Sequence, residues 1–112
     1  MSEQELTEIE ISLSNAEYAV RNLECLERLY KNKDFKHLVL DGYFVKQASR
    51  AVMGKAEPAM QTEDAQGEMV RDIDSIGRLK QYFVAVRAMG ELARKSIADD
   101  SKTREEILAE DL

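Results

Sequence analysis

Apolar side chains recur at helical spacing through most of the chain, and the pattern is densest between Met69 and Ile97. One row of positions follows steps of three and four: Met69, Ile73, Ile76, Leu79, Phe83, Val86, Gly90, Ala93 and Ile97. This spacing predicts an α-helix with one apolar face. A second row lies beside the first: Tyr82, Ala85, Met89 and Leu92. A helix with so wide an apolar arc must be covered on two sides, by its own chain or by another copy.

The N-terminal part carries a heptad pattern that predicts a helix over about residues 7–31. Its seam consists of Ile9, Leu13, Ala16, Val20, Leu23, Glu27 and Tyr30. Two alternatives compete with this assignment. The alternation from Glu8 to Leu13 is compatible with a short strand, but no second strand is available to pair with it. The capping-box pattern from Ser14 to Glu17 would instead begin the helix only at residue 14.

Local start and stop signals divide the rest of the chain. Asp34 is expected to cap a short helix over about 35–41 that Gly42 ends, and Thr62 is expected to open the long helix. A helix over about 43–55 is expected to bury Phe44, Ala48, Ala51 and Val52. The polar run 99–101 predicts an interruption, followed by a short helix over about 103–110.

The sequence thus predicts an all-α fold. We expect an antiparallel helical hairpin of residues 7–31 and about 63–98, elaborated by the short helices at 35–41, 43–55 and 103–110. The length of 112 residues fits a single domain over 1–112. The ends, residues 1–6 and 99–112, are expected to be flexible or to dock to a partner.

Glycine and charge indicate how the helices pack. Gly77 and Gly90 each disfavour a helix interior by about 1 kcal/mol relative to Ala, so we expect a neighbouring helix to approach them closely. The net charge is −6, and its sign alternates in blocks along the chain. Residues 1–20, 56–77 and 96–112 are acidic, whereas 21–55 and 78–95 are basic. Two antiparallel helices would place acidic halves beside basic halves, which favours the hairpin.

Composition excludes several classes of protein. Five Gly and one Pro are too few for the turns of an all-β fold. The single Cys25 allows neither an internal disulfide nor a cysteine-based metal cluster, which fits a reducing cytoplasm. No apolar run approaches the ~20 residues that span a bilayer, and the start has no signal-peptide pattern. We therefore expect a soluble protein without a membrane partner.

Isolated polar residues give no catalytic, metal or cofactor site. Asp72 and Asp74 point about 200° apart on a helix, so they cannot chelate one ion. His37 has no second histidine, no nucleophile and no orienting group beside it in the pattern. Cys25 is interpreted as a small hydrophobe packed near the first seam. These residues predict a protein that is not an enzyme and has no cofactor.

A basic cluster on the long helix comprises Arg78, Lys80, Arg87, Arg94 and Lys95. Acidic blocks flank it on both sides, which disfavours direct binding of nucleic acid. We expect these side chains to border the seam and to meet the acids of the first helix.

Protein–protein contact is the remaining possibility. The candidate residues of the wide arc are Leu79, Tyr82, Phe83, Val86, Met89 and Leu92. The acidic tail adds Ile107 and Leu108, which form either a docking peptide or a frayed end.

The chain also resembles a group of small, uncharacterised, acidic helical proteins encoded by tailed bacteriophages. The resemblance rests on EIEISLSNAEYA, LERLYKNKDFKHLVLDGYF, RDIDSIGRLKQYF and TREEILAED, and spans nearly the whole chain. Its most distinctive parts are KNKDFKHLVLDGYF and DIDSIGRLKQYF. It implies a protein made in the bacterial host cytoplasm and built into the virion, and it supplies no catalytic residues.

Pattern and resemblance together predict a non-enzymatic phage protein that acts through protein–protein contacts as a small virion or assembly component. Its partner would be another copy of itself or a larger phage structural protein. The alternative is a host-directed effector that binds and inhibits a bacterial enzyme or defence protein. Alternating acidic and basic blocks disfavour the alternative, because a mimic of nucleic acid needs a continuous acidic face.

Overall fold

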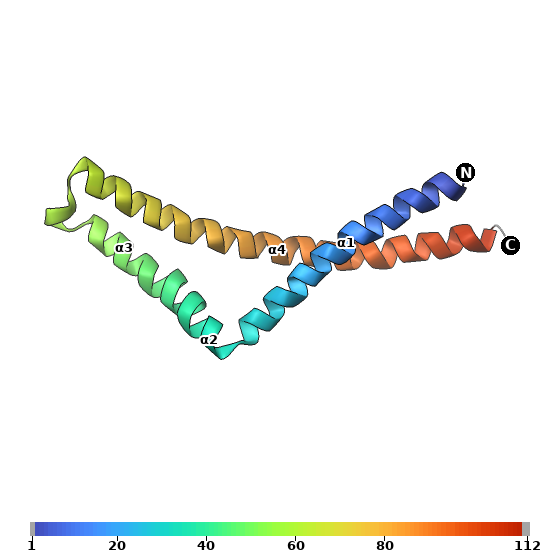
Figure 1. The fold of residues 1–112 in the computed structure, drawn as a ribbon, viewed down its shortest axis with the longest axis horizontal. Coiled ribbons are helices and arrows are strands. Elements are labelled where there is room, and N and C mark those ends of the chain that lie inside the picture. Colours follow the sequence, from blue (N-terminus) through green and yellow to red (C-terminus); the bar gives the residue numbers. More distant parts are fainter. Residues whose placement is uncertain (1, 111–112) are drawn as a thin grey trace. The chain divides into compact units, whose positions relative to one another are not determined.

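The structure is a computed structural model that describes residues 2–110, and within this range it is almost entirely helical, with no strand (Figure 1). The helices in order are α1 (Ser2–Lys31), α2 (Lys33–Phe35), the π-helix η1 (Lys36–Gln47), α3 (Ala48–Lys55), the 3₁₀ turn η2 (Pro58–Met60) and α4 (Glu63–Glu110). The predicted all-α class is confirmed.

The contacts divide the chain into two compact units. Unit 1 combines residues 1–26 with 85–112, and unit 2 is the continuous segment 27–84. Each long helix contributes to both units. The prediction of a single domain stays a prediction, and each unit is described by itself below.

Helix α1 begins earlier than the sequence predicted. It starts at Ser2 instead of residue 7, and the strand predicted as an alternative over 8–13 is wrong. Glu3 and Glu5 lie in the first turn, where their carboxylates interact favourably with the positive end of the helix dipole. The capping-box pattern at Ser14 does not start a helix, because Ser14 lies in the interior of α1.

The predicted pair of helices at 35–41 and 43–55 forms one uninterrupted helical path. Asn32, and not Asp34, caps its start, because the Asn32 side chain accepts a hydrogen bond of 2.9 Å from the Phe35 amide. Gly42 was expected to end a helix, but its φ is not positive, so it cannot form the left-handed cap. It lies inside η1, where an added Cβ would be 3.0 Å from the His37 carbonyl oxygen.

Helix α4 is also longer than predicted. Thr62 opens it as expected, accepting a hydrogen bond of 3.2 Å from the Ala65 amide. The interruption at 99–101 and the separate helix at 103–110 are wrong, because α4 continues to Glu110. The Thr103 hydroxyl donates to the Asp99 carbonyl oxygen at 3.0 Å, so this residue supports a helix interior instead of a cap.

The core of unit 1 lies where α1 meets α4. Leu23 of α1 is fully buried, and Ala16, Leu26 and Ala93 are nearly so. A Cβ added at Gly90 would collide with the Leu23 side chain, approaching its Cδ2 to 2.8 Å. The predicted close approach at Gly90 is thus confirmed.

Within this unit the two helical segments run in opposite directions. Leu23 contacts Gly90, while Glu10 forms an ion pair of 3.4 Å with Arg104. Towards the chain ends, the helices border a shallow hollow lined by Glu5, Glu8, Ile9, Asp100, Thr103 and Ile107.

Unit 2 is a second helical pair, in which α3 and η1 lie along the first part of α4. Gly54 lies close to the Met69 side chain, and the Gln66 side chain donates a hydrogen bond of 2.8 Å to the Lys55 carbonyl oxygen. Its buried residues are Ala51 and Ile76. Ala51 was predicted to be buried, but Val52, predicted with it, is 55% exposed. Gly77 has no atom within 4 Å of an added Cβ, so the predicted approach there is wrong.

Candidate protein-interaction surface

The two apolar rows predicted on α4 have different environments. The first row is the covered one. Ile76, Gly90 and Ala93 are buried, and Phe83 and Val86 are half-buried. Its exception is Leu79, which is 36% exposed. The chain therefore covers one side of the wide arc.

The second row is open to solvent. Tyr82, Met89 and Leu92 are 59%, 62% and 68% exposed, and Ala85 and Ala88 between them are exposed as well. At 3.6 residues per turn these five residues share one side of a continuous helix. We call them the α4 stripe. Large apolar side chains at such spacing, left in water, are typical of a surface that contacts another protein.

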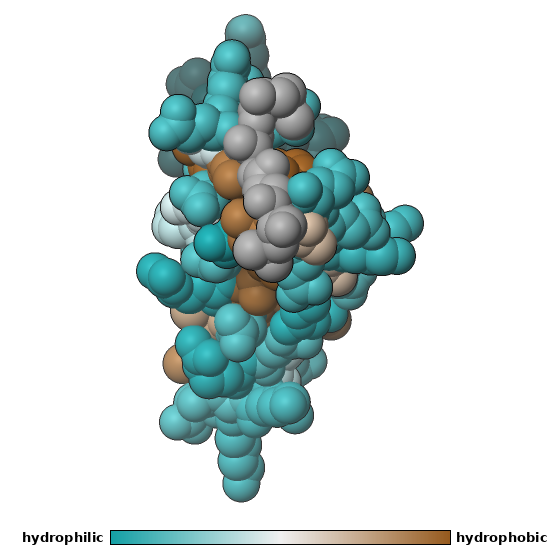
Figure 2. Space-filling model, turned by 90° about the vertical axis from the view of Figure 1, so that its right-hand side faces the viewer, coloured by the Kyte–Doolittle hydropathy of each residue, from teal (hydrophilic) through white to brown (hydrophobic). Residues whose placement is uncertain are grey.

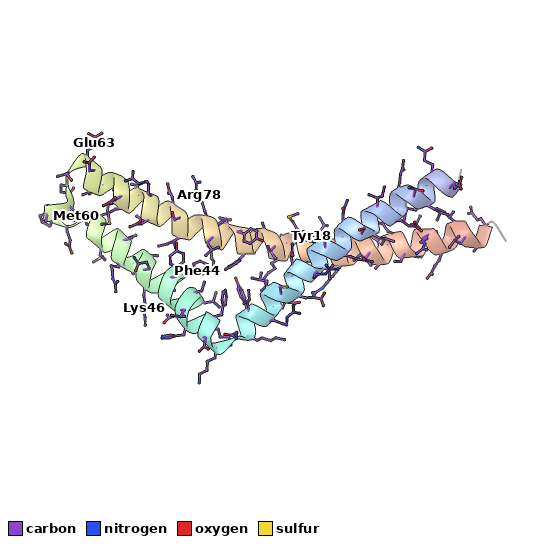
Figure 3. The ribbon with its side chains drawn as sticks, viewed as in Figure 1. Tyr18, Phe44, Lys46, Met60, Glu63 and Arg78 are labelled. Atoms are coloured by element: carbon purple, nitrogen blue, oxygen red, sulfur yellow. The ribbon has the colours of Figure 1, made fainter. Side chains whose placement is uncertain are left out.

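Phe83 belongs to an aromatic cluster inside unit 2. Its ring centroid lies 5.8 Å from that of Phe44, 5.9 Å from that of Phe35 and 6.3 Å from that of Tyr30. Phe44 lies on η1 and extends toward α4 (Figure 3). The Lys80 ammonium lies 5.3 Å from the centre of the Phe44 ring, a cation–π contact. Phe83 thus holds η1, α2 and the end of α1 against α4, while its neighbour Tyr82 belongs to the exposed stripe.

The two candidate residues of the tail point in different directions. Ile107 is half-buried and lines the hollow beside Ile9, whereas Leu108 is 45% exposed. The tail is part of α4 and not a separate peptide. In the view of Figure 2, hydrophobic residues form small patches within a largely hydrophilic surface.

The isolated polar residues lie apart from one another. Asp72, Asp74 and His37 are exposed. Over residues 2–110, no group of three or more His, Cys, Asp or Glu side chains is arranged to hold a metal ion. Cys25 was interpreted as buried, but it is exposed, because it lies on the side of α1 opposite the residues that touch α4. In the same range, no helix has the length and apolar composition needed to cross a membrane.

Sequence reasoning missed other exposed apolar residues. On α1 these are Ile11, Tyr18 and Leu29, at 58%, 64% and 40%, and on the path from η1 to α3 they are Leu38, Val45, Val52 and Met53. A signal for the α1 residues was present, because Ile11, Tyr18 and Cys25 repeat every seven residues outside the assigned seam.

Comparison with known proteins gives no relative: no protein-family model, curated protein or solved structure matches the chain.

Proposed function

We propose that this chain is a non-enzymatic phage protein that acts through protein–protein contacts, as a small virion or assembly component. The observation that carries the proposal is the α4 stripe. An isolated monomer would keep Tyr82, Met89 and Leu92 in water, although each would contribute roughly 1.5–3 kcal/mol if fully buried. The phage origin and the bacterial cytoplasm as site of synthesis rest on the resemblance of the four quoted sequence segments.

The fold supports a role as a helical adaptor. We propose that α1 and α4 form an antiparallel hairpin, as their opposite directions within unit 1 favour. The stripe lies on the same helix but outside the row that touches α1. A partner helix can therefore bind it without opening the core.

The test is a triple substitution, Tyr82→Gln with Met89→Gln and Leu92→Gln. Because these side chains are exposed, the variant should fold like the wild type. It should bind its partner at least about 100-fold more weakly, since three anchoring side chains lose their apolar contact. Val84→Gln is the matched control, because Val84 is 49% exposed on α4 but lies off the stripe.

The measurement is made in infected cells with a tagged chain. Wild type and the Val84 control should sediment with purified particles or assembly intermediates, and the triple variant should remain with the free protein. If wild type, the Val84 control and the triple variant are incorporated into particles equally, the role of the stripe is refuted. A wild-type chain found only on a host enzyme would refute the virion role and support the host-directed alternative.

A further inference from the structure

The outward side of α1 carries a strip without any charged residue. The strip consists of Gln4, Thr7, Ile11, Ser14, Asn15, Tyr18, Asn22, Cys25 and Leu29. The whole helix contains seven Glu and three Arg or Lys, so the absence of charge on this side is a marked bias. Depletion of charge at the centre with charge at the rim is the composition of protein interfaces.

The residues of the strip from Gln4 to Cys25 lie outside the core of unit 1. Ala16 and Leu23, which are buried, lie on the opposite side of α1. Ile11 and Tyr18 are 58% and 64% exposed, and Leu29 is 40% exposed. Tyr18 lies near the middle of α1 (Figure 3). An apolar residue at every seventh position, separated by small polar ones, is the pattern of a weak coiled-coil seam.

The charges beside the strip are complementary to those of a second α1 helix that runs in the opposite direction. Helix α1 is acidic in its first turn, with Glu3 and Glu5, and basic in its last turn, with Arg28 and Lys31. A second α1 in the same direction would place like charges together, whereas one in the opposite direction would place acid beside base. The α4 stripe could not pair with itself equally well, because the segment 78–95 around it is basic.

We propose that a second copy of this chain binds to the strip, with the two α1 helices antiparallel and related by a twofold axis at Tyr18. In this register Tyr18 faces Tyr18 of the second copy, and Ile11 faces Cys25. Asn22 faces Ser14, which gives its amide a hydrogen-bonding partner. A polar pair inside a seam fixes the register, as an Asn does in coiled coils.

The flanking charges agree with this register. Glu17 comes beside Arg21 of the second copy. The twofold axis places this pair twice in the interface. These pairs lie at the solvent-exposed rim, so added salt should shift the equilibrium from dimer towards monomer. The interface does not involve the α4 stripe, so either proposal can fail without the other.

Disulfide cross-linking through the native Cys25 tests the register. In the antiparallel dimer, the Cys25 residues of the two copies are separated by 14 residues, or about 21 Å, which is too far for a disulfide. Ile11→Cys places a thiol opposite Cys25 of the second copy. Mild oxidation of this variant should yield a covalent dimer on a non-reducing gel.

Two matched controls make the result specific. Wild type has only Cys25, and Ile11→Cys combined with Cys25→Ser has only residue 11, so neither should cross-link. A disulfide within one chain is excluded by the same 21 Å separation along the helix. Cross-linking of wild type would indicate parallel helices and would overturn the proposal, as would the absence of a covalent dimer in the Ile11→Cys variant.

A second variant tests the interface without a disulfide. Tyr18→Glu places two carboxylates at the twofold axis and should convert dimer to monomer in light scattering across a concentration series. Its far-ultraviolet circular dichroism should match wild type, because Tyr18 is exposed in the single chain. A folded Tyr18→Glu variant that stays as dimeric as wild type would overturn the proposal.

Discussion

The contact between Gly90 and Leu23 gives the sharpest prediction about the fold. In a helix interior, replacing Gly by Ala normally stabilises by about 1 kcal/mol, because Ala loses less backbone entropy. At Gly90 the new methyl group would collide with Leu23, whose side chain is fully buried and cannot move aside into solvent. Overpacking of this kind costs about 1–3 kcal/mol. We therefore expect Gly90→Ala to lower the free energy of unfolding by about 1 kcal/mol.

Gly77→Ala is the matched control on the same helix. Nothing lies within 4 Å of the added methyl group, and Gly77 is exposed, so only the helix preference remains. The free energy of unfolding of this variant should rise by up to about 1 kcal/mol. The two substitutions are chemically identical, and their effects should differ by about 2 kcal/mol with opposite signs.

Urea unfolding followed by circular dichroism measures both values, and a double-mutant cycle locates the cause. Leu23→Ala alone should cost about 2–5 kcal/mol by leaving a cavity. In that background the collision is absent, so Gly90→Ala should become neutral or stabilising. If Gly90→Ala stabilises wild type as much as Gly77→Ala does, the close packing of α1 on α4 is refuted.

Two further predictions concern unit 2. Phe83→Ala should lower the free energy of unfolding by about 3 kcal/mol in urea, because the ring contacts Phe35 and Phe44, whereas Val84→Ala should change it by less than about 1 kcal/mol. Equal effects would contradict the aromatic cluster. Asn32→Ala should lower the free energy of unfolding by about 1 kcal/mol in thermal or urea unfolding, because it removes the side chain that accepts from the Phe35 amide. Asn32→Asp should retain most of this stabilisation, because a carboxylate can accept the same hydrogen bond. A neutral Asn32→Ala would show that this cap does not stabilise the helix start.

The periodicity of apolar residues was the most reliable guide to the fold. The rows through Ala16 and Leu23 on α1, and through Ile76 and Ala93 on α4, are the rows that the structure buries. These rows extend over many turns, and their burial depends on the sum of many contacts. A long, regular pattern therefore identifies the buried face correctly.

Short local signals were less reliable. Gly42, the run at 99–101 and the pattern at Ser14 each match a helix terminus, yet helix continues through all three. Each signal favours a helix end by only about 1 kcal/mol. At 99–101, the packing of Ile107 beside Ile9 and the exposed ion pair of Arg104 with Glu10 favour continuation of α4. The π-helical hydrogen bonding of η1 has no composition signature, so its sequence could not reveal it.

The candidate surface was predictable in part. Sequence showed that α4 is apolar on two sides but not which side the chain covers, because that depends on where the neighbouring helices pack. The uncharged strip of α1 was visible as a seven-residue repeat, but it was hidden by the stronger seam on the other side. On α1 and on α4, the second row is the one that the chain leaves exposed.

The two proposed surfaces have a joint consequence. The strip and the α4 stripe lie on different helices, and the α1 interface uses none of the stripe residues. A dimer formed through α1 would therefore carry two copies of the stripe, one from each chain. A phage particle or an assembly intermediate presents its own subunits in many copies, so two linked stripes would bind it more tightly than one without any new contact. If both proposals hold, a weak interface on α1 would be sufficient, because it would need only to hold two binding helices in one molecule.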